Sequence, residues 1–161
     1  TDAEPMRLMT FTDYCLRVLI YLAIEPDRRA TIAEIATAFD ISQNHLMKVV
    51  HFLGRHKLLT NVRGRGGGMQ LARPAAEINI GEVVRLSEAG AVPAECFDRS
   101  SSACIITPAC QFRRILGEAM EAFNGVLDRY TLADLTEQQR RPLARILSVP
   151  VPDPRRPRRA P

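Results

Sequence analysis

The chain has 161 residues, of which 46% are hydrophobic and 6% aromatic, so we expect a single domain whose core is built from aliphatic side chains. The longest apolar run, residues 18–24, is far shorter than the roughly 20 residues that span a bilayer, which argues against a membrane protein and favours a cytoplasmic one. Residues 1–76 carry ten Lys and Arg against seven Asp and Glu, and residues 137–161 carry seven against two. Residues 77–136, by contrast, carry five Lys and Arg against nine Asp and Glu. A polyanion would therefore be bound by the N-terminal part and not by the acidic middle.

The first predicted element is a helix over residues 10–25, closed by Pro26. Cys15, Val18 and Leu19 lie on one face of this helix at helical spacing, together with Leu22. A cysteine on an apolar face behaves as a small hydrophobic side chain. We therefore interpret Cys15 as a core residue.

Residues 31–57 predict two short helices joined by a tight turn. Thr31 and Glu34 have the spacing of a capping box, which starts the first helix, and Ser42 can cap the second. The second helix has a polar and basic outer face opposite its apolar stripe, which is formed by Leu46, Val49, Val50 and Leu53. This arrangement is typical of a helix-turn-helix that binds DNA.

Residues 59–71 predict a β-hairpin with a glycine-rich tip, the wing of a winged helix. Two β-prone pieces flank the tip, which carries Arg63 and Arg65, and its glycines let it approach a nucleic-acid backbone closely. The glycine spacing matches neither a P-loop nor a dinucleotide-binding motif. Six residues of the second helix and the tip are candidates for contact with DNA: Gln43, Asn44, His45, Lys48, Arg63 and Arg65.

Three of the four cysteines lie within residues 95–110, ECFDRSSSACIITPAC, at the spacing C-x7-C-x5-C. A structural zinc site usually shows closer pairs, C-x2–4-C, and a catalytic thiol needs a nearby histidine, whereas the histidines here all lie within residues 45–56. Iron–sulfur ligation needs thiolates and tolerates irregular loops. The residues alone leave open an iron–sulfur cluster, a zinc site or disulfide switch, and unliganded cysteines.

Residues 110–130 predict a helix of about 20 residues, roughly 30 Å long, which is more than a small winged-helix domain needs to cover. We expect the surplus apolar stripe to pack against a second copy of the chain and make a homodimer. The stripe consists of Phe112, Ile115, Leu116, Ala119, Met120, Phe123, Val126, Leu127 and Tyr130. The final segment, VPVPDPRRPRRAP, is rich in proline and arginine and predicts a disordered tail.

Together these segments resemble the winged-helix iron–sulfur transcriptional repressors of the NsrR, IscR and RirA type. The resemblance covers residues 6–135 and rests on MRLMTFTDYCLRVLIYLA, IAEIATAFDISQNHLMKVV, VRGRGGGMQLAR, the three cysteines and LDRYTLADL. IscR-type members carry C-x5-C-x5-C and a ligating histidine three residues after the last cysteine, where this chain has Arg113. The chain is therefore most similar to the NsrR type, which senses nitric oxide.

The resemblance implies a homodimeric repressor, not an enzyme, that binds palindromic double-stranded DNA when its iron–sulfur cluster is intact and releases it on nitrosylation. It implies that Cys96, Cys104 and Cys110 hold the cluster, of the 4Fe–4S form in preference to 2Fe–2S, with Asp13 of the partner subunit as fourth ligand. From the residues alone, Asp13 could instead cap a helix, because Thr10 and Asp13 have capping-box spacing. Two alternatives stay open: an iron- or redox-responsive regulator of the same fold, and a zinc- or thiol-based interaction or redox protein.

The expected fold is mainly α-helical with a small β-hairpin wing, a winged helix-turn-helix domain followed by a long dimerisation helix. We expect residues 6–89 to form the DNA-binding domain and residues 90–110 the cluster-binding loop. Residues 111–148 would form the dimerisation helix and a C-terminal helical segment, and residues 149–161 a disordered basic tail.

Overall fold

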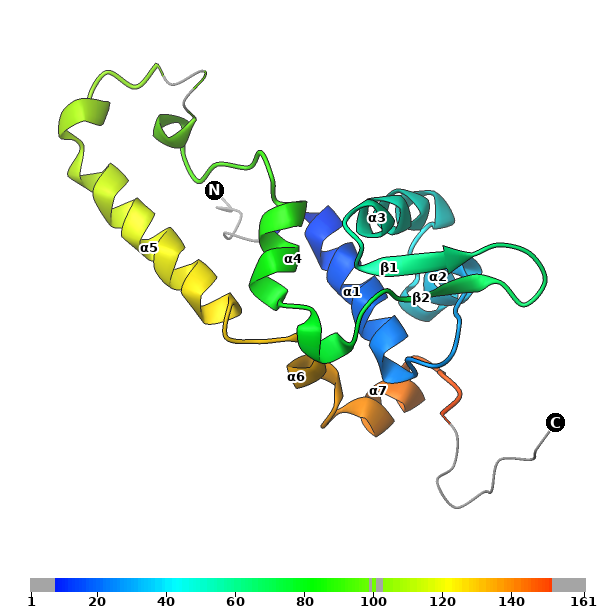
Figure 1. Ribbon diagram of the computed structural model, residues 1–161. Helices are drawn as coiled ribbons and strands as arrows, with labels where there is room; N and C mark the ends of the chain where they lie inside the picture. The colour runs from blue at the N-terminus through cyan, green and yellow to red at the C-terminus, as the bar shows by residue number, and fades with distance from the viewer. Residues whose placement is uncertain (1–7, 99, 101–102, 152–161) are drawn as a thin grey trace.

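The computed structural model describes residues 8–98, 100 and 103–151 (Figure 1). These residues form a mainly helical fold with one antiparallel hairpin, which confirms the predicted fold class. The elements are α1 (Thr10–Ile24), α2 (Ile32–Phe39), α3 (Gln43–Arg55), β1 (Leu59–Val62), β2 (Gly68–Leu71), α4 (Ile80–Ser87), α5 (Gln111–Leu127), α6 (Leu132–Thr136) and α7 (Arg140–Ile146), with short 3-10 turns η1 (Ala75–Glu77), η2 (Glu95–Phe97) and η3 (Thr107–Ala109).

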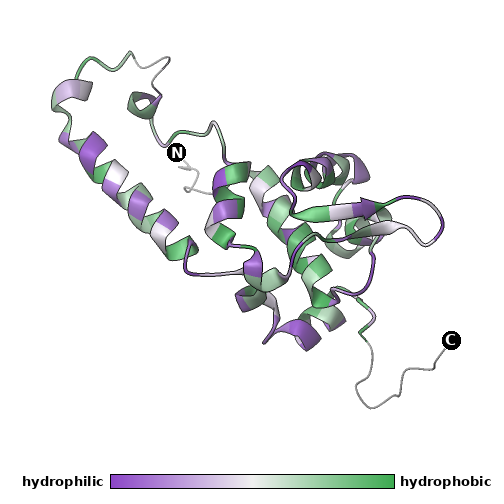
Figure 2. Ribbon diagram, in the orientation of Figure 1, coloured by the Kyte–Doolittle hydropathy of each residue, from purple (hydrophilic) through white to green (hydrophobic). Residues whose placement is uncertain are grey.

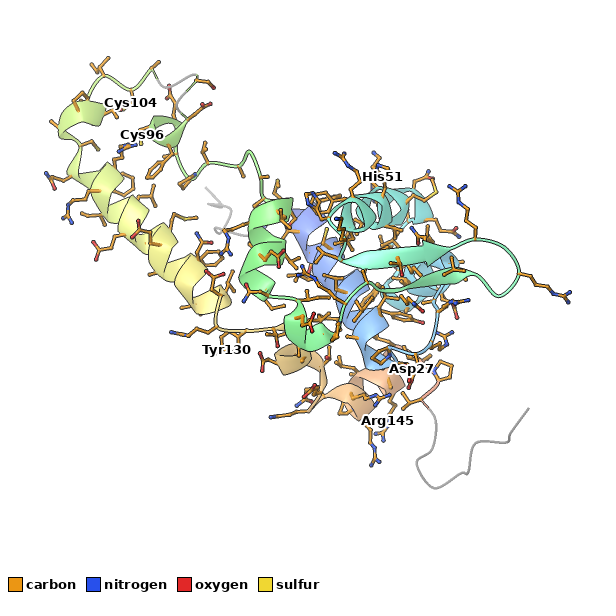
Figure 3. All side chains as sticks on the ribbon, viewed as in Figure 1. Asp27, His51, Cys96, Cys104, Tyr130 and Arg145 are labelled. Carbon is orange, nitrogen blue, oxygen red and sulfur yellow. The ribbon has the colours of Figure 1, made fainter. Side chains whose placement is uncertain are left out.

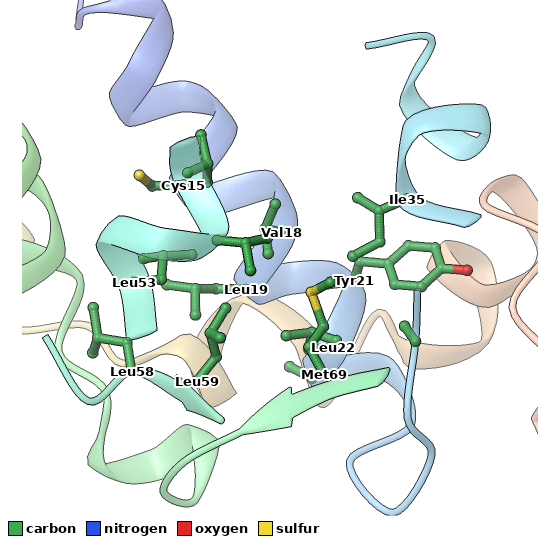
Figure 4. Close-up of a cluster of buried hydrophobic side chains, with 14 of the residues drawn as sticks. Cys15, Val18, Leu19, Tyr21, Leu22, Ile35, Leu53, Leu58, Leu59 and Met69 are labelled. Atoms are coloured by element: carbon green, nitrogen blue, oxygen red, sulfur yellow. The ribbon is translucent and has the colours of Figure 1, made fainter. Parts of the chain in front are cut away.

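The core surrounds α1, which packs against α3, α4, α6, α7 and β2 (Figure 4). Val18 and Leu19 are fully buried there, as the spacing of apolar residues predicts. Cys15 is also fully buried, and burial raises the pKa of its thiol to about 12. The interpretation of Cys15 as a core side chain is confirmed.

The helix-turn-helix begins and ends where its capping residues predict. The side-chain oxygen of Thr31 accepts the Glu34 N–H at 3.2 Å, and the Glu34 carboxylate accepts the Thr31 N–H at 2.6 Å, so both halves of the capping box are present. Ser42 Oγ accepts the His45 N–H at the start of α3. The turn has no glycine because Asp40 adopts the left-handed conformation itself, with φ 53°, which aspartate tolerates better than most residues.

The C-terminal helices α6 and α7 pack against α1 and complete the core of the N-terminal part of the chain. Leu132 is fully buried, and Thr131 and Asp134 form a capping box at the start of α6. Val149 is buried in the same core, so it does not belong to the predicted disordered tail. Most of that tail, residues 152–161, lies outside the described residues.

Helix α5 stands apart from this core in Figure 1, and Figure 2 shows that hydrophobic residues recur along it. None of its residues is buried, and Phe112 and Ile115 of the predicted stripe are 63% and 52% exposed. Its C-terminal end is held to α4, because Arg85 pairs with Asp128 at 2.6 Å and the Ile80 N–H donates to the Tyr130 carbonyl. In a single chain, α5 is therefore anchored at one end and presents an open apolar face.

Candidate functional site

The outer face of α3 carries the residues expected to contact DNA. Gln43, Asn44, His45 and Lys48 are all exposed, because the apolar stripe on the other side of the helix faces the core. The ring of His45 lies 6.2 Å from the ring of Tyr14 in α1. The start of α3 thus has polar side chains free to enter a groove and a direct contact with the first turns of α1.

The β1–β2 hairpin lies beside α3 and projects beyond it (Figure 1). Arg63 and Arg65 are exposed at its tip, as predicted for a wing. The tip bends sharply at Gly66, whose φ of 73° is one that residues with a Cβ rarely adopt. The structure therefore exposes the candidate α3 side chains and the two arginines on adjacent elements, α3 and the hairpin.

A third arginine at the wing was missed by the sequence analysis. Arg29, in the connection between α1 and α2, donates from Nη1 to the carbonyl of Gly66 at 3.2 Å. The contact joins residues 37 positions apart, and no periodicity or motif in the sequence pairs them.

The segment that carries three cysteines lies at the N-terminal end of α5, remote from α3 (Figure 3). Cys96, Cys104 and Cys110 are half-buried free thiols, and none forms a disulfide. Cys96 belongs to η2, whereas Cys110 is the residue that caps α5.

One side chain, Arg113, connects the two ends of this cysteine segment. Its Nε donates to the Cys96 carbonyl at 3.1 Å, and its guanidinium lies 5.2 Å from the centre of the Phe97 ring. Its backbone N–H points at the Cys110 sulfur at 3.4 Å. The first and third cysteines are therefore held at the same end of α5, although Arg113 itself offers no lone pair to a metal.

The chemistry of this donor set fits an iron–sulfur cluster, which is held by free thiolates on loops. The Cys110 sulfur also sits at a helix start, where backbone N–H groups favour negative charge. The three cysteine side chains are not arranged as metal ligands in the single chain: among the described residues, no three His, Cys, Asp or Glu side chains lie close enough to share a metal ion.

Asp13, the expected fourth ligand, does not cap α1. The helix starts at Met9 without a side-chain cap of its own, and Asp13 instead pairs with Arg17 at 2.7 Å. The capping role belongs to Glu88 at the end of α4, whose carboxylate accepts the Met9 N–H at 2.8 Å and the Thr12 hydroxyl. The capping-box alternative for Asp13 was therefore wrong, because a distant carboxylate occupies the helix start.

In residues 8–98, 100 and 103–151, no helix is both long enough and apolar enough to cross a membrane. A helix-turn-helix with an exposed second helix and an arginine-tipped hairpin beside it defines a winged-helix, DNA-binding protein. Comparison with protein families makes the assignment definite. The family model described as "Rrf2: Iron-dependent Transcriptional regulator" matches residues 8–138, and the chain belongs to this family of transcriptional regulators.

Curated relatives support the resemblance to the NsrR type. The chain is 46% identical over 140 residues to the HTH-type transcriptional regulator NsrR of Oceanobacillus iheyensis, covering 86% of this chain and 95% of the relative. It is 47% identical over 135 residues to the NsrR regulator of Bacillus subtilis, covering 83% and 92%. The family is one of regulators and not of enzymes.

Solved structures share the fold. T. potens IscR superposes with a TM-score of 0.68 at 23% identity, covering 83% of this chain and 88% of that one. CymR, the global cysteine regulator of B. subtilis, superposes with a TM-score of 0.66 at 25% identity, covering 83% and 98%. Both similarities confirm the winged-helix architecture.

Proposed function

We propose that this regulator is a nitric-oxide-responsive repressor. It acts as a homodimer in the cytoplasm, binds palindromic double-stranded DNA while it holds an iron–sulfur cluster, and releases the DNA on exposure to nitric oxide. The observation that carries the proposal is the set of three free cysteines at the exposed end of α5, on a chain whose other end is a complete winged helix. The identity to NsrR regulators over most of the chain supports the choice of effector.

Cys96, Cys104 and Cys110 would hold a 4Fe–4S cluster, with Asp13 of the partner subunit as the fourth ligand. When bound, the cluster supplies iron that reacts with nitric oxide. A carboxylate is a harder and weaker ligand for such iron than a thiolate, so the aspartate position is the exchangeable one.

The ion pair between Asp13 and Arg17 competes with this ligand role. The two side chains are 46% and 41% exposed, and ion pairs with this much solvent contribute at most about 1 kcal/mol. The Asp13 carboxylate could therefore leave Arg17 at little cost and serve as a ligand.

The open face of α5 is the surface that a second copy would cover. Five side chains of the predicted stripe remain between 38% and 63% exposed in the single chain: Phe112, Ile115, Phe123, Val126 and Tyr130. A cavity of about 550 Å³ continues this face between α5 and the end of α4, where Phe123 and Met120 line it together with Val92. The proposed ligand set requires that pairing of two such faces about a two-fold axis bring α1 of one protomer towards the cysteine segment of its partner.

The contacts of α1 provide a route from Asp13 to the DNA-binding surface. Tyr14 follows Asp13 directly and contacts His45, and the Phe11 ring lies 5.1 Å from the Phe52 ring of α3 in an edge-to-face arrangement. A shift of the first turns of α1 would therefore change the position of α3. Ligand loss can alter DNA affinity only by the amount that these two positions differ in free energy.

The proposed ligand set is tested by comparing Asp13→Ala with the wild-type protein after anaerobic purification. We expect Asp13→Ala to release iron to a chelator roughly tenfold faster while the melting temperature of the cluster-free protein stays unchanged, because the Asp13 side chain is 46% exposed and caps no helix. Arg17→Ala is the matched control, since it breaks the same ion pair and leaves the carboxylate. Equal rates of iron release in Asp13→Ala and wild type would remove Asp13 from the ligand set, and colourless protein with stoichiometric zinc would refute the cluster.

A further inference from the structure

We propose that Arg29 is a third DNA-contacting arginine of the wing, which braces the wing tip and binds a backbone phosphate beside Arg63 and Arg65. The proposal rests on the DNA binding of the proposed function and adds to the predicted wing contacts, Arg63 and Arg65, a residue from a different part of the chain. It rests on three features of the segment that precedes α2: its pairing with β2, its hydrogen bond to the tip, and its unused charge.

The backbone at Arg29 is fixed to the base of the wing. The next residue, Ala30, forms an isolated antiparallel bridge with Met69, in which the Ala30 N–H donates to the Met69 carbonyl at 2.9 Å and the Met69 N–H donates back at 2.7 Å. Ala30 is buried and Met69 is in the core, so this bridge is part of the fixed structure. A Cβ added to Gly68 would lie 3.2 Å from the Arg29 Cβ, which shows how closely the wing strand passes.

The side chain of Arg29 then runs out along the hairpin to its tip. Its Nη1 donates to the Gly66 carbonyl at 3.2 Å, and the residue is exposed. This bond joins Arg29 to the same turn of the chain that carries Arg65. A guanidinium has five N–H donors in a planar fork, and only one is used here.

The neighbouring Arg28 differs from Arg29 because its charge is used within the fold. Arg28 is half-buried and pairs with the Glu34 carboxylate of the α2 capping box, and this partner raises its pKa. Arg29, by contrast, has no ion pair within the described part of the chain. Arg28 therefore stabilises the start of α2, whereas the charge of Arg29 is available for a polyanion.

A phosphate is the group that this arrangement fits. The remaining N–H donors of Arg29 can bind two oxygens of one phosphate group in a bidentate manner, while the bond to Gly66 keeps the fork oriented. Neutralising one more phosphate releases counterions, and the slope of log affinity against log salt steepens by about 0.9 for each phosphate contacted.

The test measures DNA affinity of the anaerobically purified dimer by fluorescence anisotropy across a series of KCl concentrations, with a duplex selected by the protein from a random pool. For Arg29→Ala we expect roughly tenfold weaker binding and a slope shallower by about 0.9. Arg29→Lys should keep most of the slope, whereas Arg29→Gln, which retains a donor to Gly66 without the charge, should lose it. Arg145→Ala, on α7 and away from α3 and the wing (Figure 3), is the matched control and should change neither quantity.

An unchanged slope in Arg29→Ala and Arg29→Gln would overturn the phosphate contact, even if affinity fell. The variant Arg65→Ala distinguishes a failure of the Arg29 contact from a failure of DNA binding by the wing. If Arg65→Ala flattens the slope and Arg29→Ala does not, the wing binds DNA and only the role of Arg29 is wrong. If neither variant changes the slope, the predicted wing contact of Arg65 is wrong as well.

Discussion

Ile115 lies in the N-terminal half of the uncovered stripe of α5 and gives the sharpest test of the proposed dimer. It is 52% exposed in the single chain, although its helix neighbours on the same face are also apolar. In a two-fold symmetric interface each substitution is made twice, once on each helix. We therefore consider Ile115→Lys, which replaces two apolar side chains by two ammonium groups.

The expected size of the effect follows from the exposed fraction. Full burial of an isoleucine side chain contributes about 1.5–3 kcal/mol, so burying the remaining half contributes about 1 kcal/mol per protomer and about 2 kcal/mol per dimer. Loss of about 2 kcal/mol weakens dimerisation by roughly 30-fold. Burying an unpaired ammonium costs several kcal/mol more, so 30-fold is the smallest effect expected.

Sedimentation velocity over a range of protein concentrations measures this dimer dissociation constant. The matched control is Glu121→Lys, which places a lysine at an exposed position on the opposite side of α5 and should leave the dimer intact. Circular dichroism should show both variants folded, because no residue of α5 is buried in the single chain. If Ile115→Lys and Glu121→Lys have the same dissociation constant, α5 is not the dimer interface and the reasoning from its open face is refuted.

Two further predictions concern the core and the joint between α4 and α5. Burial raises the pKa of Cys15 from 9.0 to about 12, so the contribution of the neutral thiol to stability should be full below pH 9 and be lost as the pH rises towards 12. In the folded cluster-free protein, iodoacetamide should alkylate Cys104 well before Cys15. Equal alkylation rates would contradict the burial of Cys15. In Gly81→Ala the new Cβ would lie 2.0 Å from Oδ1 of Asp128, so the carboxylate must turn away and its ion pair with Arg85 must break. Because that exposed pair contributes roughly 0.5 kcal/mol and alanine gains up to about 1 kcal/mol over glycine in a helix, we expect a near-unchanged free energy of unfolding in urea. Arg85→Ala should then cost nothing further in the Gly81→Ala background, and a preserved cost would show that the pair survives.

Local signals in the sequence predicted most of the fold. Thr31 and Ser42 cap the helices that their spacing indicates, and the glycine-rich stretch forms the wing hairpin. The stripe of α5 was found from its periodicity alone, and its exposure in the single chain agrees with a helix that has more apolar surface than the domain can cover. These features depend on residues close together in the sequence, so elementary rules of capping and periodicity suffice.

Features that depend on distant residues were missed or misread. One alternative considered for Asp13 was a helix cap, but the carboxylate of Glu88 binds the helix start instead, at Met9 and Thr12, which lie 79 and 76 positions away. Arg29 was overlooked for the same reason, since its partner Gly66 is brought near only by the bridge to β2. Val149 was assigned to the tail because of its proline-rich context, although its side chain is buried in the core cluster. Each of these contacts exists only once the chain is folded.

The most direct test of the central claim is a nitric oxide titration of the anaerobic, cluster-loaded dimer bound to a fluorescent operator duplex. Anisotropy and visible absorbance are recorded together, with cluster-free protein and a Cys104→Ala variant as controls. The account predicts loss of anisotropy in step with the change in absorbance within a few equivalents of nitric oxide per cluster, and weak binding that does not respond in both controls. DNA that stays bound while the absorbance changes fully would contradict it.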